Sequence, residues 1–239
     1  VRASLAEKYT LYSAVDGKSF NRFFLSGCLS GLAISKRASL PDMENLGRCL
    51  GRFHTYNDTA GLRVLSPDTL SYLRTYLGNI KQPDLLTGKI AEWVSRQNDS
   101  CGVTAWIHGN VKSEDIFMVD NKACFIDFGT CGVGVPYEDL TNLCTYMMLF
   151  HMVPLFPWRV ARHAMSAFLR GYAAESSLEK DCLYNYITRG ICRYYIKNTV
   201  FHNGIASVSG FPVQKSRLER LLVQLLQEDY VAAFDGVRF

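Results

Sequence analysis

The sequence predicts an α+β protein whose body is mainly helical and whose sheet is small. Apolar residues recur at helical spacing through most of the chain after residue 40. Short segments rich in aromatic and β-favouring residues lie before residue 26 and between residues 105 and 128. The chain has 239 residues and 48% of them are hydrophobic, so it can bury a substantial core.

The N-terminal segments predict a β-hairpin. Residues 5–15 and 20–25 are rich in aromatic and β-favouring side chains, and the turn signal Asp16-Gly17-Lys18 lies between them. A loop is expected at residues 26–31, where two glycines and two serines cluster.

Helices are predicted along the rest of the chain. The segment 41–57 begins at Pro41, and its apolar positions recur every three or four residues. We interpret His54, near its end, as a core histidine. The further predicted helices are 67–78, 84–98, 138–152, 157–174, 178–202 and 213–234. The last carries a leucine stripe that we interpret as core, at Leu218, Leu221, Leu222, Leu225 and Leu226.

Two polar-ended segments lie between residues 105 and 129. The first is Trp106-Ile-His-Gly-Asn-Val-Lys-Ser-Glu-Asp115-Ile-Phe, and the second is Cys124-Phe-Ile-Asp-Phe-Gly129. The turn Val119-Asp-Asn-Lys122 between them predicts a β-hairpin over 105–128, which would bring the polar groups together. Carboxylate oxygens such as those of Asp115 and Asp127 suit magnesium.

These segments resemble the catalytic core of the aminoglycoside phosphotransferase and choline kinase family, a branch of the protein-kinase-like fold. In that family the catalytic loop has the consensus H-G-D-x-x-x-x-N, and the metal motif has the consensus I-D-F/W-G/E. The spacing is kept here, but the Asp and the Asn of the loop are exchanged: Asn110 holds the position of the base, and Asp115 holds that of the metal-binding Asn. The residues that match the family are His108, Gly109, Asp127, Phe128 and Gly129.

The resemblance covers about residues 5–175 and implies a fold. Residues 1–30 would be the remnant of an N-terminal sheet with its hinge, and residues 31–239 a mainly helical C-terminal lobe with the catalytic hairpin at 105–128. The segment 45–54 is similar to a family helix that ends in Leu-His.

The resemblance also implies a site for ATP-dependent transfer of a phosphoryl group to a hydroxyl of a small molecule. His108, Asn110 and Asp115 would form the catalytic loop, and Asp115 and Asp127 would bind Mg²⁺. Phe128 and Gly129 would complete the cofactor motif with Asp127. An amide such as that of Asn110 can orient an alcohol, but it cannot accept a proton near neutral pH.

A kinase-like nucleotide site also needs a glycine-rich loop over the phosphates and a strand lysine. No G-x-G-x-x-G pattern precedes residue 26, and Gly27–Gly31 does not match it. Together with Asn110, this favours a pseudokinase, or a domain or fragment of a larger protein. The alternative is an active phosphotransferase whose missing lobe comes from a partner protein or an upstream segment.

Acidic residues of the helical half are candidates for contacting a cationic acceptor. They are Glu138, Asp139 and Glu175. For Asp139 we favour a simpler interpretation, as the N-cap of a helix that begins at Leu140.

The composition of the chain limits the classes of binding partner and the cellular compartment that we expect. The net charge is only +4 without a basic block, which gives no support to nucleic-acid binding. Eight cysteines without C-x-x-C or zinc spacing predict reduced thiols in a cytoplasmic protein. The start, Val1-Arg-Ala-Ser-Leu, lacks both Met and an apolar leader segment, so we expect a processed product or a piece of a longer protein. The apolar run 143–158 contains two prolines and predicts a buried helix, not a membrane span.

Overall fold

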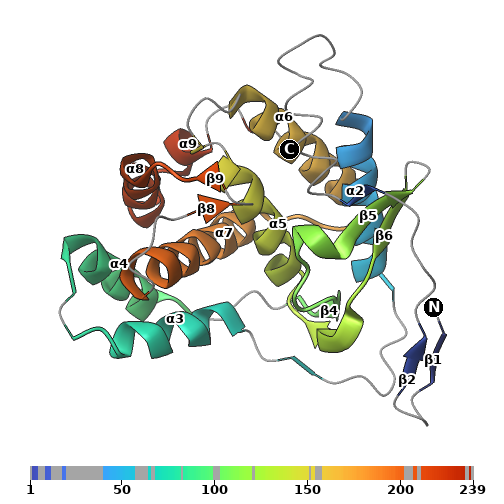
Figure 1. Ribbon diagram of the computed structural model, residues 1–239, viewed down its shortest axis with the longest axis horizontal. Helices are drawn as coiled ribbons and strands as arrows, with labels where there is room; N and C mark the ends of the chain where they lie inside the picture. The colour runs from blue at the N-terminus through green and yellow to red at the C-terminus, as the bar shows by residue number, and fades with distance from the viewer. Residues whose placement is uncertain are drawn as a thin grey trace.

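The computed structural model describes residues 2–4, 9–11, 18–19, 40–56, 64–65, 68–81, 83–98, 103–119, 122–150, 152–153, 158–201, 207–208, 211–234 and 237. Most of these residues are helical. The short strands β1, β2, β4, β5 and β6 lie on one side of the helical body, whereas β8 and β9 lie among the helices beside α5 and α8 (Figure 1). The helices are α2 (Leu40–His54), α3 (Asp68–Gly78), α4 (Leu85–Arg96), α5 (Tyr137–Phe150), α6 (Trp158–Ala173), α7 (Lys180–Tyr195), α8 (Lys215–Leu226) and α9 (Tyr230–Ala233). The predicted α+β fold with a mainly helical body is confirmed.

The strands are β1 (Arg2–Ser4), β2 (Tyr9–Leu11), β3 (Lys18–Ser19), β4 (Ala105–Ile107), β5 (Ile116–Val119), β6 (Lys122–Phe125), β7 (Gly132–Gly134), β8 (Ser207–Val208) and β9 (Phe211–Pro212). All the strand pairs are antiparallel among the residues that the structure describes. The described residues also include short turns of helix: η1 (Ser113–Asp115), η2 (Phe128–Thr130) and the π-helical η3 (Ile196–Phe201), which continues α7.

The predicted catalytic hairpin is shorter than expected. It consists of β5 and β6, with Val119 opposite Lys122 as the turn signal predicts. The first expected strand, β4, does not belong to it and pairs with β7 instead. We expected one hairpin over residues 105–128, and this is wrong for β4. The polar loop between Ile107 and Ile116 separates β4, which pairs with β7, from β5, which pairs with β6.

The N-terminal hairpin also differs from the expectation. β1 pairs with β2, and Lys18, which we expected in a turn, begins β3 and pairs with Met118 of β5. The local sequence Asp16-Gly17-Lys18 favours a turn, but pairing with the distant strand β5 places Lys18 in a strand. The strand expected at 20–25 and the proposed domain boundary at residue 30 lie outside the described residues.

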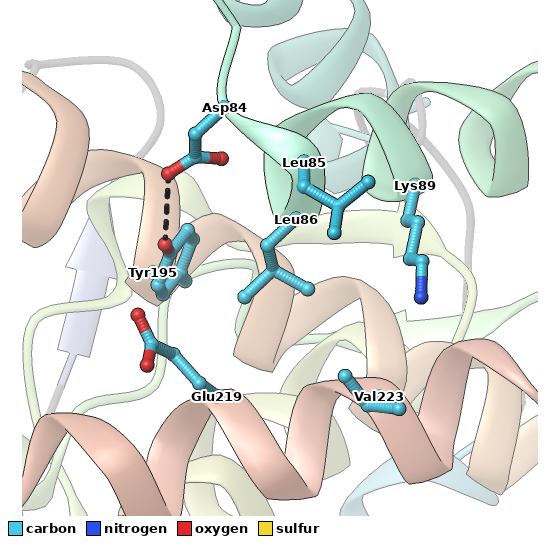
Figure 2. A pocket seen from close by; sticks show the side chains of 7 residues that line it. All are labelled: Asp84, Leu85, Leu86, Lys89, Tyr195, Glu219 and Val223. Atoms are coloured by element: carbon cyan, nitrogen blue, oxygen red, sulfur yellow. Dashed lines mark hydrogen bonds between the residues drawn. The ribbon is translucent and has the colours of Figure 1, made fainter.

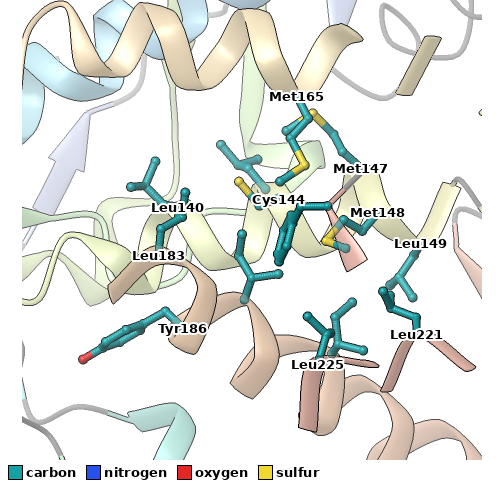
Figure 3. Packing of buried hydrophobic residues seen from close by; sticks show 14 of the residues in the cluster. Leu140, Cys144, Met147, Met148, Leu149, Met165, Leu183, Tyr186, Leu221 and Leu225 are labelled. Carbon is teal, nitrogen blue, oxygen red and sulfur yellow. The ribbon is translucent and has the colours of Figure 1, made fainter. Parts of the chain in front are cut away.

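The core lies where α2, α5, α6, α7 and α8 meet. Figure 3 shows Leu140 and Cys144 of α5, Met165 of α6, Leu183 of α7 and Leu225 of α8 around one interior region. The C-terminal leucine stripe is buried, as we interpreted it. Its helix is not continuous to residue 234, however, because Glu228 adopts a positive φ of 59° between α8 and α9.

The structure also tests two expectations drawn from composition, on membrane-spanning helices and on the state of the cysteines. None of the helices in the described ranges has the length and apolar character that crossing a bilayer requires. Cys182 is disulfide-bonded, so the expectation of reduced thiols is wrong at that position. The cysteines that are free among the described residues are Cys49, Cys124, Cys131, Cys144 and Cys192.

Candidate functional site

Two hydrogen bonds join the catalytic-loop segment to the segment that ends in Asp127. Nε2 of His108 lies 2.7 Å from the carbonyl oxygen of Ile126, which can only accept, so Nε2 carries the hydrogen. The backbone N–H of Ile126 donates to the carbonyl oxygen of Asp115 at 2.9 Å. The structure therefore brings His108, Asp115 and Asp127 into one neighbourhood, as predicted. His108 and Asp127 follow β4 and β6, whereas Asp115 directly precedes β5.

Asp139 fixes the start of the catalytic loop. Its Oδ2 accepts from the backbone N–H of His108 at 2.7 Å, and its Oδ1 accepts from that of Gly109 at 3.0 Å. Nε2 of His54 lies 3.2 Å from Oδ2, and Nδ1 of His54 lies 2.9 Å from the hydroxyl of Tyr172. The Asp139 side chain is fully buried, so these charge-assisted bonds act in a low dielectric.

The interpretation of Asp139 as a helix N-cap is wrong. Asp139 lies inside α5, which begins at Tyr137, and its carboxylate bonds to a loop 30 residues away. His54 is a buried core histidine, as interpreted, and it also orients the Asp139 carboxylate. No local pattern in the sequence could assign this bond, because it depends on how α2 and α5 pack.

Two residues of the site adopt left-handed backbone conformations. Gly109 has φ 81°, and a Cβ there would lie 2.5 Å from the carbonyl oxygen of Thr130. Asp127 has φ 62° and ψ 53°, which is uncommon for a residue with a side chain. Thr130 closes the arrangement by donating from Oγ1 to the carbonyl oxygen of His108 at 3.0 Å. Such backbone geometry is often found where a side chain is aimed for a function.

Aromatic rings support the same residues. The ring centroid of Phe128 lies 4.9 Å from that of His108 and 5.9 Å from that of Phe53. Trp106 lies 6.1 Å from Phe53 in an edge-on arrangement. Phe128 therefore packs on the face of the loop histidine and links it to the end of α2.

The carboxylates of Asp115 and Asp127 form an electrostatically unfavourable pair. Asp115 is only 8% exposed, and its Oδ2 has no hydrogen-bond partner among the described residues. Burial raises the pKa of Asp115, the positive charge of Lys112 opposes the rise, and the negative charge of Asp127 adds to it. Asp127 itself is exposed.

This pair fits a divalent cation. A cation would supply the missing partner of Oδ2 and cancel the repulsion between the two carboxylates. No group of three or more His, Cys, Asp or Glu side chains in the described ranges could hold a metal ion. Magnesium commonly binds one or two carboxylates together with water and phosphate oxygens, so two carboxylates are consistent with a site that a nucleotide completes.

Asn110 lies half-buried in the loop, directly after Gly109. Its side chain makes no hydrogen bond with another residue that the structure describes. Gly129, the last residue of the cofactor motif, is exposed beside Asp127, with room for a Cβ at 3.6 Å from Asp127 Oδ1.

The acidic residues expected to meet a cationic acceptor are not available for it. Glu138 is 9% exposed and accepts a 2.5 Å hydrogen bond from Thr69. Asp139 is fully buried, and Glu175 pairs with Arg52 at 2.9 Å and with Arg48 at 3.6 Å. That expectation is therefore wrong for all three residues.

The family follows from a comparison of sequences. The profile of the Phosphotransferase enzyme family (APH) matches residues 4–175. The chain belongs to this family. The match covers the catalytic loop, the metal motif and the helices α2 to α6 that position them, which confirms the resemblance noted from the motifs.

Several solved structures are similar to this chain. A macrolide 2'-phosphotransferase type I superimposes with a TM-score of 0.50 at 14% identity, covering 80% of this chain and 60% of that one. An amicoumacin kinase, hAmiN, in complex with AMP-PNP, Ca²⁺ and Ami gives 0.48 at 17% identity, covering 79% and 58%. The macrolide 2'-phosphotransferase MphH from Brachybacterium faecium gives 0.47 at 16%, covering 79% and 60%. No protein of curated function matches the sequence.

The chain spans about three fifths of the length of these relatives. Its fold is the protein-kinase-like fold of the phosphotransferase family, represented by a helical lobe with a reduced sheet.

Proposed function

We propose that this phosphotransferase-family chain binds a divalent cation together with a nucleotide at Asp115 and Asp127, and does not transfer the phosphoryl group by itself. The observation that carries the binding is the buried, unpartnered Oδ2 of Asp115 beside a second carboxylate. A bound Mg²⁺ with ATP would neutralise negative charge on the phosphates.

The absence of transfer is inferred from Asn110. An amide at the base position can accept a hydrogen bond from an acceptor hydroxyl and hold it in line, but it cannot take the proton. Loss of a general base typically lowers a rate by a factor of about 10²–10⁴. The 239 residues also contain no glycine-rich phosphate loop before the hinge segment, and positioning of the phosphates supplies much of this catalysis.

In this proposal His108 is a positioning residue. Its bond to Ile126 holds the loop against the strand that leads to Asp127. The ring of Phe128 packs against the imidazole and helps to keep it in place. Both contacts help to set the separation of the two carboxylates that share the cation.

An active phosphotransferase acting on a small-molecule hydroxyl is the second candidate. The observation that favours it is Asp139, because its two bonds to the loop backbone preserve a fixed loop geometry. An upstream segment or a partner protein would then supply the phosphate-gripping lobe, and Asp115 or Glu114 would be the nearest carboxylate to accept the proton. For either candidate we propose a cytoplasmic location. The five free thiols among the described cysteines support it, and the disulfide at Cys182 argues against it.

Thermal unfolding with a non-hydrolysable ATP analogue tests the binding. A ligand that binds only the folded state raises the free energy of unfolding by about 2.7 kcal/mol at a hundred times its Kd. We expect the midpoint to rise when magnesium and the analogue are both present, and this rise to vanish in Asp127→Asn and shrink in Asp115→Asn. Asp181→Asn, an exposed change on α7, is the control that keeps the full response.

Consumption of ATP tests the absence of transfer. The wild-type chain should consume ATP no faster than a blank with magnesium alone. An unchanged affinity for the analogue in Asp127→Asn would contradict the proposed site, whereas turnover by the isolated chain would favour the second candidate.

A further inference from the structure

A cavity of about 290 Å³ opens far from the catalytic loop, between the start of α4, the end of α7 and the exposed side of α8. In Figure 1, α4 and α8 lie on the opposite side of the molecule from β4, β5 and β6. None of the residues that line the cavity belongs to the loop or the metal motif. They are Asp84, Leu85, Leu86, Lys89, Tyr195, Glu219 and Val223.

One end of the cavity is negative. Asp84 caps α4 by accepting from the Thr87 backbone N–H at 2.7 Å, and the side-chain and backbone bonds from Thr87 lower the pKa of Asp84. The hydroxyl of Tyr195 lies 3.5 Å from the other oxygen of Asp84. Burial and then the charges of Asp84 and Glu219 raise the pKa of Tyr195 to about 12, so the phenol stays neutral between two carboxylates.

The charge at this end does not cancel. Lys215 lies 3.7 Å from Glu219 and also acts on Asp84 through its charge. Two carboxylates against one ammonium leave one net negative charge around Tyr195. A cationic group of a ligand would therefore be favoured there.

The other end is positive, and an apolar surface separates the two ends. Figure 2 shows Lys89 at the end opposite Glu219, with Leu85, Leu86 and Val223 between them. Lys89 has no ion pair with any residue that the structure describes. Leu85 is 81% exposed, which leaves a large apolar side chain at the rim without cover.

Apolar side chains of two helices separate the charged ends. Lys89 lies four residues after Leu85 on α4, and Val223 lies four residues after Glu219 on α8. A ligand that meets both ends must extend over Leu85, Leu86 and Val223, which lie between them in Figure 2. Two extended residues span about 7 Å, which gives a dipeptide more reach than the single residue of a free α-amino acid.

We propose that this cavity binds a small zwitterion of dipeptide size with apolar side chains. Its ammonium group would lie against Glu219 and Asp84, its carboxylate against Lys89, and its side chains on Leu85, Leu86 and Val223. The volume lies just below the range of pockets for drug-sized ligands, about 300–1,000 Å³, which suits a ligand of this size.

Calorimetric titration of the chain with leucyl-leucine tests the proposal. We expect leucyl-leucine to bind, and leucyl-leucinamide and N-acetyl-leucyl-leucine each to bind about fivefold more weakly, since each has lost one charge pair at a partly exposed site. Glycylglycine, which keeps both charges without the apolar body, should bind more weakly than leucyl-leucine. No binding of leucyl-leucine, equal binding of the three leucine ligands, or binding of glycylglycine as tight as that of leucyl-leucine would overturn the proposal.

Matched variants test which charged group of the ligand lies at each end of the cavity. In Lys89→Gln, leucyl-leucine and leucyl-leucinamide should bind equally, because the partner of the carboxylate is gone. In Glu219→Gln, the preference for leucyl-leucine over its acetylated form should fall. Lys122→Gln, an exposed change on β6, should keep both preferences. Preferences that stay unchanged in the two cavity variants would place the ligand elsewhere.

Discussion

Two neighbouring acidic residues of α5, Glu138 and Asp139, serve different purposes. Asp139 has each carboxylate oxygen bonded to a backbone N–H of the catalytic loop, so its burial is compensated. Glu138 is bonded to Thr69 through one oxygen only, and its Oε1 has no partner among the described residues. Asp139 therefore organises the site, whereas Glu138 is a buried charge with incomplete compensation.

The environment of Glu138 makes the stability of the protein depend on pH. Burial raises the pKa of Glu138, and the bond from Thr69 and the charges of Arg193 and Arg189 only partly oppose the rise. Because the folded pKa is raised, the unfolded chain loses this proton first as pH increases. The free energy of unfolding should therefore fall as pH rises from about 4, the ordinary range of a glutamate.

We predict that Glu138→Gln removes this contribution. Glutamine can still accept from Thr69 but carries no charge, so the stability of the variant relative to wild type should increase between about pH 4 and neutral pH and then level off. Denaturant unfolding at a series of pH values measures the difference. Glu92→Gln, at an exposed position on α4, should show no such trend, and a difference that is independent of pH would contradict the prediction.

At the scale of single residues, the sequence was sufficient to find His108, Asn110, Asp115 and Asp127, because the spacing of a motif is a local property. The sequence was insufficient to predict that Asp139 bonds to the catalytic loop. The bonds of Asp139 join α5 to a loop some 30 residues earlier, and helix-capping rules favoured a local role. The roles proposed for the motif residues in binding and catalysis stay predictions until tested.

At the scale of elements, the contact between α2 and α6 depends on glycines. A Cβ at Gly47 would lie 2.0 Å from the carbonyl oxygen of Phe168, and one at Gly171 would lie 1.9 Å from that of Glu44. The two helix backbones therefore touch without intervening side chains. This close approach places His54, at the end of α2, beside Tyr172 of α6 and hence beside Asp139.

We predict that Gly47→Ala destabilises the protein by about 1–3 kcal/mol, because the added methyl group meets backbone that can move only if the helices separate. Gly88→Ala is the matched control. It lies in α4 with nothing within 4 Å of its Cβ position, so it should stabilise the protein by about 0.5–1 kcal/mol through higher helix propensity. Denaturant unfolding of both variants checks the prediction, and similar effects of the two changes would argue against the close helix contact.

The sequence predicted the elements unequally well. Helices followed from apolar periodicity, and α2, α3 and α4 begin and end within a few residues of the expected positions. Strand pairing was less predictable, because β4 pairs with β7 and β3 with β5 through contacts that local patterns do not contain. The end of α8 was missed because Glu228 takes a left-handed conformation without a glycine to signal it.

At the scale of the whole molecule, the described helices form a support for the catalytic loop. α2 and α6 are in backbone contact, and α5 reaches the loop through Asp139. β5 begins directly after Asp115, and β6 leads to Asp127. The chain spans about three fifths of the length of its structural relatives. We therefore give two causes for the proposed lack of phosphoryl transfer by this chain alone. One is the amide of Asn110 at the position of the base, and the other is the lack of a glycine-rich phosphate loop in these 239 residues.

The change Asn110→Asp separates these two causes. In the 239-residue chain we expect no appreciable ATP consumption by either the wild type or the variant, because a proton acceptor gains little when the phosphates are not held in line. In an assembly that adds an upstream segment or a partner carrying the loop and lysine, the same change should raise turnover tenfold or more. Asn79→Asp, an exposed change directly after α3, is the control and should leave turnover unchanged. Appreciable turnover by the isolated wild-type chain would defeat the proposal, and it would mean that Asp115 or Glu114 accepts the proton in place of residue 110.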